Sequence, residues 1–391
     1  MIMKYSYDGE VEWAQGIGGT ESDYIKSVAE CSDGGYIVGG GFRSSSIYLG
    51  KEVSLTNQHN DDGMVIKFEK TELPNLTVVQ AKEMAVTGSD YINSVVECND
   101  RGYIVGGYFS RSIDLGNGVT LSAKGDKDGM IIKYNSEGTI EWAQGIGGGD
   151  GDFINSVTEC SDGGCIAAGY FKSRNIDLGN GISLTNKGEQ DGMLIKYKKN
   201  GEVEWAQGIG GIYTDNIYSV AESSDGGCIV AGYFKSCNID LGNGVNITCK
   251  RSFNDNGIVI KYDSNGKAEW AQWTEGTSHS YLNAVEECDD GGFIVGGDFY
   301  GSSINVGNQT ITGTSSPNGM VIKFSSSGEV EWARVNAYKI DSLINCSDGG
   351  YLVSGYFWGT TDIDLGNGVS LENNDTNDGM IMKYSYDGEV E

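Results

Sequence analysis

Few residues of this chain have the types and spacing of a catalytic centre. His59 and His279 are its only histidines. Both fall in segments that we expect to be loops, where a surface histidine is a simpler interpretation than a catalytic base or a ligand. Neither an H-E-x-x-H motif nor a paired C-x-x-C motif is present. The sequence therefore predicts a protein that is not an enzyme.

Two sets of carboxylates recur at fixed places in one repeated phrase. They are Glu30, Glu97, Glu159, Glu222 and Glu287, and Asp23, Asp90, Asp152 and Asp215. Like charges that converge on a channel raise one another's pKa unless water or a cation lies between them. Oxygen ligands suit Ca²⁺, so the Asp set is a candidate metal site and the Glu set a candidate ring of acids. We favour the alternative, in which each carboxylate caps local backbone N–H groups or meets solvent, and we predict no cofactor.

The aromatic residues fall into two groups. A Trp recurs at one place in the repeated phrase, where we expect it to seal one repeat against the next. The irregular aromatics are better candidates for ligand contacts, because aromatic rings with nearby Asn and Asp suit glycans or peptides. These candidates are Tyr213, Phe253, Trp273, Tyr281, Tyr300, Tyr338 and Trp358.

The nine cysteines raise the question of disulfides. Five of them occupy one repeated position, and bridged Cα atoms must lie ~4.4–6.8 Å apart, so we expect these five to be small apolar fillers. Two pairs are close enough in sequence to test, Cys160 with Cys165 and Cys237 with Cys249. We expect free thiols.

A repeat positions all of these side chains. The Gly that opens the phrase G-M-x-I-K recurs at steps of 66, 63, 65, 62 and 60 residues, at Gly63, Gly129, Gly192, Gly257, Gly319 and Gly379. A second marker keeps the same spacing, at Cys31, Cys98, Cys160, Ser223, Cys288 and Cys346. The chain therefore consists of six units of about 63 residues, and such periodicity decides the architecture.

Each unit predicts four strands, a to d, typified by residues 92–98, 102–109, 129–134 and 139–146. All four are rich in Val, Ile, Tyr and Trp and are too short for helices. S-D-G-G turns join a to b, and N-G or E-G turns join c to d. Six four-stranded antiparallel units predict an all-β, six-bladed β-propeller, with blades at about 18–84, 85–147, 148–210, 211–275, 276–336 and 337–391.

The two ends of the chain suggest how the last blade is completed. Residues 1–12 are identical to residues 380–391, and the sixth unit lacks the W-A-Q-G-I of its own strand d. We expect residues 1–17, with Trp13, to supply that strand and so remove an exposed edge. A start within a repeat indicates an excerpt of a longer protein. We expect one domain over residues 1–391, and a monomer unless the duplicated ends exchange strands.

Composition narrows the partners. The formal net charge is −28, which argues against nucleic acid and against anionic membranes. No apolar stretch approaches the ~20 residues of a membrane helix, and no signal peptide opens the chain. The b–c connections are long and carry an N-G pattern that predicts an extra hairpin, as at residues 113–121. We expect the face with the b–c and d–a loops to bind ligands.

Residues 128–171, D-G-M-I-I-K-Y-N-S-E-G-T-I-E-W-A-Q-G-I-G-G followed by D-F-I-N-S-V, D-G-G and G-Y-F, resemble the SBBP β-propeller repeat of bacterial surface and secreted proteins. The double Gly that ends strand b also looks kelch-like. The resemblance covers the whole chain and implies the propeller fold and an extracellular setting. It brings no catalytic motif, and a shared fold is not a shared function.

The sequence thus favours a non-catalytic binding module of a bacterial surface or secreted protein that engages protein or carbohydrate. The alternative is a structural or self-assembling spacer. A sialidase-like hydrolase ranks lower, because the S-Y-D-G-E-V-E-W turn at residues 6–13 echoes an Asp-box with the wrong spacing and arginines are sparse.

Overall fold

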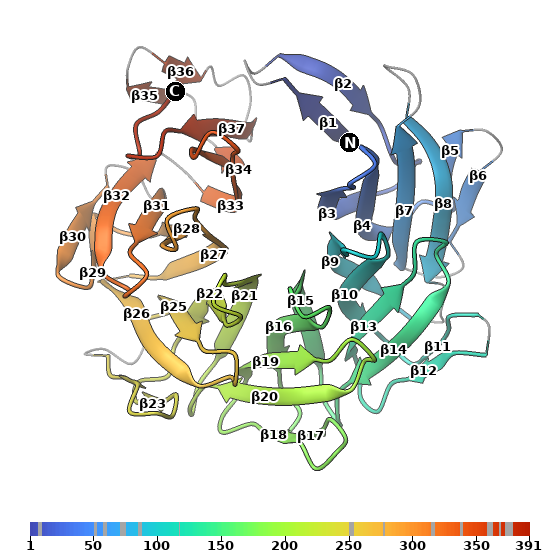
Figure 1. Cartoon of the computed structure of the whole chain (residues 1–391), viewed down its shortest axis with the longest axis horizontal. Helices are drawn as coiled ribbons and strands as arrows, with labels where there is room; N and C mark the ends of the chain where they lie inside the picture. The colour runs from blue at the N-terminus through green and yellow to red at the C-terminus, as the bar shows by residue number, and fades with distance from the viewer. Residues whose placement is uncertain are drawn as a thin grey trace. The chain divides into compact units, whose positions relative to one another are not determined.

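The chain is an all-β, six-bladed propeller of four-stranded antiparallel blades (Figure 1). The computed structural model describes all residues except 7–9, 51–52, 58–60, 71–75, 85–87, 117, 250–253, 277, 314–316, 337–338, 358–362, 367–368 and 372–377. The described part of the chain contains no helix, and so none that could cross a membrane. It divides into two compact units, residues 1–185 with 195–204 (unit one) and residues 186–194 with 205–391 (unit two). That the two units form a single domain over residues 1–391 stays a prediction.

Unit one begins with the hairpin of β1 (Ile2–Tyr5) and β2 (Val11–Gln15). Its first two blades run in the order a-b-c-d. They are β3 (Asp23–Glu30), β4 (Tyr36–Phe42), β7 (Asp62–Lys70) and β8 (Leu76–Met84), then β9 (Tyr91–Glu97), β10 (Tyr103–Phe109), β13 (Asp128–Tyr134) and β14 (Ile140–Ile146). The third blade comprises β15 (Asp152–Glu159), β16 (Cys165–Phe171), β19 (Asp191–Tyr197) and β20 (Val203–Ile209).

Unit two contains the remaining blades. The fourth is β21 (Asp215–Glu222), β22 (Cys228–Phe234), β25 (Asn256–Tyr262) and β26 (Ala268–Gly276); the fifth is β27 (Ser280–Glu287), β28 (Phe293–Phe299), β31 (Asn318–Phe324) and β32 (Val330–Asn336). The last sheet has three strands, β33 (Lys339–Asn345), β34 (Tyr351–Phe357) and β37 (Asp378–Tyr384), and the beginning of a fourth at the Tyr384–Val390 bridge. The strand bounds predicted for the second repeat are therefore right to within one residue.

The extra hairpins predicted in the b–c connections are present. They are β5 (Ser46–Gly50) with β6 (Val53–Thr56), β11 (Ser112–Asp114) with β12 (Thr120–Ser122), β17 (Asn175–Asp177) with β18 (Ser183–Thr185), β23 (Ile239–Asp240) with β24 (Asn246–Ile247), β29 (Ser303–Val306) with β30 (Gln309–Thr312), and β35 (Ile363–Gly366) with β36 (Val369–Leu371). Ile113 lies opposite Leu121, as the N-G pattern requires.

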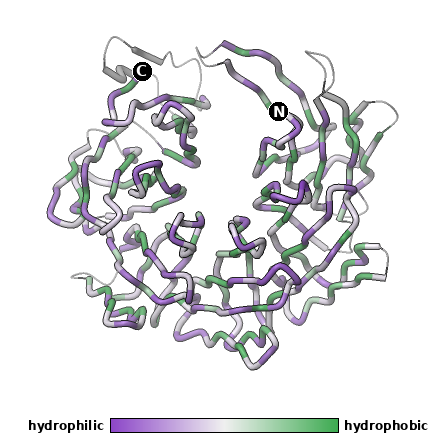
Figure 2. Tube along the Cα trace, in the orientation of Figure 1, coloured by the Kyte–Doolittle hydropathy of each residue, from purple (hydrophilic) through white to green (hydrophobic). Residues whose placement is uncertain are grey.

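Strands b and c form the core of each blade. Every residue of β13 is buried, and in β10 all but Tyr108 are buried. Figure 2 shows these middle strands as largely hydrophobic segments. Strands covered on both faces read as continuous apolar runs instead of alternating ones, which explains the sequences Y-I-V-G-G-Y-F and D-G-M-I-I-K-Y.

Strand a contains a β-bulge in every blade. In β9 the register shifts so that Ile92 lies opposite Gly107 and Ser94 opposite Gly106, and Asn93 has no opposite residue. The bulge turns the apolar residues at positions i and i+3 of strand a to the same side of the sheet. In β9 these are Ile92 and Val95, which pack around Gly39 of the preceding blade. The unopposed residue of each blade is Lys26, Asn93, Asn155, Tyr218, Asn283 or Asp341.

The bulge requires a glycine on strand b. A Cβ added to Gly107 would lie 1.9 Å from the backbone oxygen of Tyr91, and the same approach of 1.9–2.0 Å recurs in the other five blades, at Gly40, Gly169, Gly232, Gly297 and Gly355. No side chain fits there without moving backbone.

The repeated Trp joins one blade to the next, as predicted. Trp142 donates a hydrogen bond from Nε1 to the carbonyl of Lys199 (3.1 Å), and a Cβ on Gly201 would lie 2.7 Å from the Trp142 ring. Trp205 and Trp270 make equivalent contacts with the following c–d turns.

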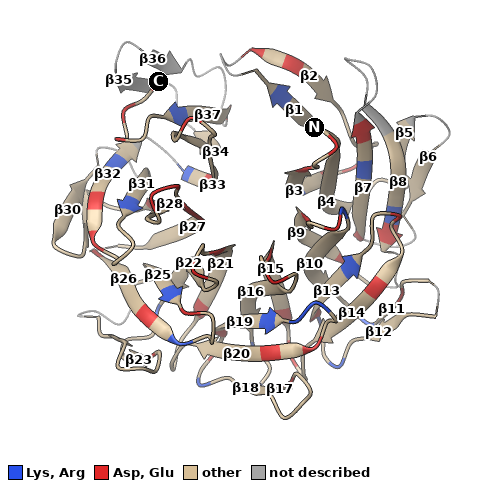
Figure 3. Ribbon diagram, viewed as in Figure 1, with Lys and Arg blue, Asp and Glu red and all other residues tan. Residues whose placement is uncertain are grey.

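A buried ion pair ties strand c to the a–b turn. Lys133 Nζ lies 2.7 Å from Asp100, whose carboxylate also accepts the N–H of Gly102 (2.8 Å). Burial alone would lower the pKa of Lys133, but its hydrogen bond to Asp100 and its contacts with Cys98 together outweigh burial and raise that pKa. Figure 3 shows the lysine within each of the strands β13, β19, β25 and β31. The Lys of the G-M-x-I-K motif thus pairs with the Asp of the a–b turn motif.

The predicted partner of Trp13 is wrong. Trp13 lies on β2 opposite Lys4 of β1, so residues 2–15 form their own c–d hairpin instead of supplying a strand to β37. In the last sheet, Val390 of the chain's own end makes the bridge to Tyr384. The physical reason is that residues 1–12 carry a complete strand c beside β2, and a short turn closes at a smaller entropy cost than a pairing across the whole chain.

The expectation of free thiols holds for seven cysteines and fails for one pair. Cys237 and Cys249 form a disulfide, with Cα atoms 5.1 Å apart, which closes the loop that carries β23 and β24. The other seven thiols are free, and six of them are buried, including Cys160 and Cys165.

Gly107→Ala should destabilise the fold by about 2–3 kcal/mol, because overpacking against an immovable carbonyl has a cost of this order. Gly149→Ala is the matched control, since no atom lies within 4 Å of its added Cβ. Urea unfolding followed by tryptophan fluorescence measures both. Equal midpoints for the two variants would contradict the close approach.

Unfolding in denaturant without reductant should expose seven reactive thiols, because nine cysteines less the two in the bridge leave seven. Added reductant should raise that number to nine. Titration with a thiol reagent distinguishes these values, and nine thiols before reduction would show that the bridge is absent.

Candidate ligand-binding pocket

The bulge of strand a determines which side chains gather at one end of the blades. On strand a, the residue two places before the bulged residue lies opposite a partner on strand b. In unit two these cross-strand pairs include Tyr281 with Asp298 and Lys339 with Tyr356. The bulged residues Tyr218, Asn283 and Asp341 stand next to them.

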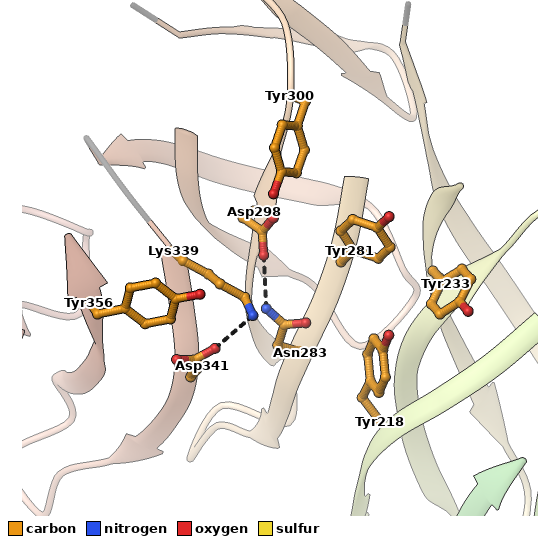
Figure 4. Close-up of a pocket in the computed structure, with 9 residues that line it drawn as sticks. All are labelled: Tyr218, Tyr233, Tyr281, Asn283, Asp298, Tyr300, Lys339, Asp341 and Tyr356. Carbon is orange, nitrogen blue, oxygen red and sulfur yellow. Dashed lines mark hydrogen bonds and ion pairs between the residues drawn. The ribbon is translucent and has the colours of Figure 1, made fainter. Parts of the chain in front are cut away.

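Together these residues form a cavity of about 540 Å³ in unit two, within the usual size of small-ligand sites, ~300–1,000 Å³. It is lined by Tyr218, Tyr233, Tyr281, Asn283, Asp298, Tyr300, Lys339, Asp341 and Tyr356. We call it the tyrosine pocket. Figure 4 shows Tyr218 and Tyr233 on one side, Tyr356 and the Lys339–Asp341 pair on the other, and Tyr300 near Asp298.

The aromatic wall is a series of ring contacts. Tyr218 packs on Tyr233 with centroids 5.5 Å apart, and Tyr233 meets Tyr281 edge to face at 5.3 Å. The Tyr281 hydroxyl donates to Asp255 (2.6 Å), and His279 Nδ1 lies 2.9 Å from the same carboxylate oxygen. His279 and Tyr281 thus share one carboxylate oxygen of Asp255.

The polar wall carries one cation and two carboxylates. Lys339 Nζ lies 3.2 Å from Asp341 and 5.6 Å from the centroid of the Tyr356 ring. Asn283 donates to Asp298 (3.0 Å) and to the backbone oxygen of Ile340 (2.8 Å). Burial raises the pKa of Asp298 to about 6, and the hydrogen bond from Asn283 lowers it only in part. Above that pH the tyrosine pocket has an excess of one negative charge.

Two of the seven predicted ligand contacts, Tyr281 and Tyr300, line the tyrosine pocket. Tyr213 lies before β21, where its N–H donates to Ser236, and Trp273 lies on β26 opposite Ile258; neither lines the pocket. Phe253, Tyr338 and Trp358 lie outside the described residues.

Most of the lining was not predicted from the sequence, although a signal was present. Core positions of strand a recur from repeat to repeat, whereas the residue two places before the bulge is Tyr24, Tyr91, Phe153, Asn216, Tyr281 or Lys339. Variation on an otherwise regular strand marks positions that the fold does not restrict to one residue type.

The aspartates proposed as metal ligands act as caps. Asp215 accepts the Ser236 hydroxyl (2.6 Å) and the N–H groups of Gly211 (2.9 Å) and Lys235 (3.0 Å). Asp23 and Asp152 hold Ser44 and Ser173 in the same way. Each therefore ties the d–a connection to the end of strand b. Among the described residues no group of three or more His, Cys, Asp or Glu is placed to hold a metal ion.

The repeated glutamates connect neighbouring blades. Glu97 accepts the N–H of Ser32 (2.7 Å), Glu159 that of Asn99 (2.8 Å) and Glu287 that of Ser224 (2.7 Å). Glu30 lies near Lys4 (3.8 Å) and accepts the Tyr36 hydroxyl (3.3 Å). Glu222 ends β21. Three of the five glutamates thus cap a backbone N–H of the neighbouring blade, whereas local caps were favoured from the sequence.

The fold and the pocket define the class of protein. It is a β-propeller built from sequence repeats, with aromatic side chains near the start of strand a and the end of strand b. No family model matches the chain. An uncharacterised WD repeat-containing protein, L264 of Acanthamoeba polyphaga mimivirus, is 22% identical over 413 residues, which cover 85% of this chain and 29% of that protein.

Solved structures with a similar arrangement include two of Sqt1 from Chaetomium thermophilum. One has a TM-score of 0.43 at 10% identity and covers 94% of this chain and 83% of Sqt1. The other, bound to the N-terminus of the ribosomal protein L10, has a TM-score of 0.44 at 9% identity over 96% of this chain and 88% of its own. BamB from Moraxella catarrhalis has a TM-score of 0.37 at 11% identity over 88% and 83%. These likenesses assign no partner to this chain.

Asp90→Asn should stabilise the protein above about pH 7 and flatten its stability profile. Asp90 is fully buried, its Oδ2 has no hydrogen-bond partner among the described residues, and burial raises its pKa to about 7. In the unfolded chain the value is ~3.9. A raised carboxyl pKa gives stability that is present below the unfolded value and lost as the pH rises to the folded value.

Asp23→Asn is the control with the opposite sign. Burial raises the pKa of Asp23, but hydrogen bonds from Ser44, Gly19 and Arg43 outweigh it and lower that pKa, so this variant should lose stability above about pH 4. Thermal unfolding from about pH 4 to pH 8 measures both variants. Parallel profiles for Asp90→Asn and the parent chain would refute the buried-acid assignment.

Proposed function

We propose that the chain is a non-catalytic binding module whose tyrosine pocket takes a protein segment bearing Lys or Arg. The observation that carries the proposal is the composition of the pocket: five tyrosines surround an excess of carboxylate over ammonium. Tyrosine faces attract a cation by ~0.5–2 kcal/mol, depending on its desolvation. The ammonium of Lys339 over Tyr356 shows that the pocket already accommodates this contact.

The charge of the whole chain supports a basic partner. A net charge of −28 accelerates encounter with cationic segments and disfavours anionic ones. A neutral glycan would gain ring stacking from the same tyrosines but nothing from the charge. Glycan binding is therefore the alternative outcome of the test.

We further propose that the chain is part of a secreted or surface protein of a bacterium. The disulfide between Cys237 and Cys249 supports an oxidising compartment. The resemblance of residues 128–171 to the SBBP repeat supports the same setting.

Asp341→Asn should weaken the binding of an arginine-bearing peptide by about fivefold, because it removes one carboxylate beside the tyrosines. Other blades carry Asn at this bulged position, at Asn93, Asn155 and Asn283, so the variant should fold. The probes are fluorescent nonapeptide pools, one with two fixed Arg and one with two fixed Glu, measured by polarisation and followed by a glycan array.

Asp263→Asn is the matched control, since it makes the same charge change in a c–d turn where the second blade has Asn135. It should leave binding unchanged. Retention of neutral glycans alone, equal binding of the Arg and Glu pools, or no binding by the folded chain would each refute the proposal.

The last sheet supports a second candidate, self-assembly by strand pairing. Within the described residues β37 pairs with β34 along its length, and its other edge bridges to Val390 and accepts the N–H of Glu391 at Lys383. Exposed strand edges are templates for pairing. Light scattering on a sizing column should then show dimers that grow with concentration, and a strictly monomeric species would remove this candidate.

A further inference from the structure

A second pocket lies in unit one, built from the same repeat positions as the tyrosine pocket. Its volume is about 360 Å³, and it is lined by Tyr24, Lys26, Arg43, Tyr91, Asn93 and Tyr108. Lys26 and Asn93 are bulged residues, Tyr24 and Tyr91 lie two places before them on strand a, and Tyr108 lies opposite Tyr91 on strand b.

The charges of this pocket are the reverse of those in unit two. Lys26 is exposed and has no ion-pair partner within the described part of the chain. Arg43 is half-exposed and is joined to Asp61 through Nε and Nη2. Lys127 lies 4.8 Å above the Tyr108 ring and 5.9 Å from that of Phe153. Lys26 and Arg43 are the two charged side chains that line the pocket, and Asp61 beside Arg43 leaves an excess of one positive charge.

The aromatic groups offer a platform beside these cations. Tyr91 stacks on Tyr108 with centroids 5.4 Å apart, and Tyr108 meets Phe153 edge to face at 4.8 Å. Tyr24 is 41% exposed, so part of its side chain is accessible to a ligand. The Asn93 amide is held in place by its hydrogen bond to the backbone oxygen of Ile154 (2.8 Å).

We propose that this second pocket binds an acidic saccharide of the uronate type, with its carboxylate at Lys26 and Arg43 and its pyranose ring against the tyrosines. Carboxylates bind ammonium and guanidinium groups through charge-assisted hydrogen bonds. The phenol hydroxyls and the Asn93 amide supply further partners for sugar hydroxyls.

An acidic peptide fits these groups less well. Asp61 already occupies the Nε edge of Arg43, so the carboxylate of either ligand would depend mainly on Lys26. A peptide carboxylate has no use for an accessible aromatic side chain, whereas a sugar ring gains from it. The net charge of −28 does not forbid an anion, because charges beyond ~8 Å are largely screened at physiological salt.

Lys26→Asn should weaken the binding of an α-1,4-linked galacturonic acid tetramer about tenfold, the loss expected for one hydrogen bond to a charged group. Asn stands at this position in three other blades, so folding should be retained. Tyr24→Asn, which copies Asn216 of the fourth blade, should also weaken binding. Calorimetry on the full chain at about 0.15 M salt measures the affinities.

Lys199→Ser is the matched control, because it removes one positive charge at a c–d turn where other blades carry Ser136 and Ser264. It should bind the tetramer like the parent chain. The methyl-esterified tetramer keeps the rings but lacks the charge, and it should bind at least about tenfold more weakly.

Equal affinity for the esterified tetramer, a preference for a Glu-rich octapeptide, or no binding of the tetramer by the folded parent would each overturn the proposal. The substitution Asp341→Asn changes the tyrosine pocket and should leave tetramer binding unchanged. The two binding proposals can therefore be refuted independently.

Discussion

The close approach of a strand-a carbonyl to a strand-b glycine is the constraint on which the blades depend. At Gly107 and its five equivalents no Cβ can be accommodated. Because these residues are glycines, strand a can bulge and still pair with strand b on both sides of the bulge. The bulge turns the Ile-x-x-Val pair toward the preceding blade and, where the pockets form, brings the bulged residue next to a cross-strand pair. Blade packing and the two pockets therefore share one backbone device.

Much of the fold could be predicted from the sequence, because its interactions repeat. The steps between glycines, the Trp and the N-G hairpins each appear several times, so errors at one copy are corrected by the others. The Ile-x-x-Val spacing on strand a departs from the two-residue period of a strand and could have revealed the bulge. The pairing of Trp13 could not be decided, because identical sequences at residues 1–12 and 380–391 offer β2 two equivalent partners.

The pockets were harder to predict, because their residues differ in every blade and so carry no pattern of their own. Tyr281 and Tyr300 could be singled out as irregular aromatic residues. Lys339 and Asp341 could not be told from other surface charges in the sequence, and only the structure shows them lining the same pocket as Tyr356. The disulfide was missed for a related reason. Cys237 and Cys249 lie outside the repeated cysteine position, and only the folding of the β23–β24 loop brings their Cα atoms within 5.1 Å.

The joint between blades has a direction: Trp142 packs against the c–d turn of the following blade at Lys199 and Gly201, and Trp205, Trp270 and Trp332 contact the next turns in the same way. A repeat with this Trp thus carries both halves of the joint, the Trp on strand d and the turn that receives one. If such a repeat were duplicated in tandem, the new copy could make the Trp–turn contact with both of its neighbours without any compensating substitution. Lineages of such proteins should then gain and lose whole repeats more readily than they alter the joint itself.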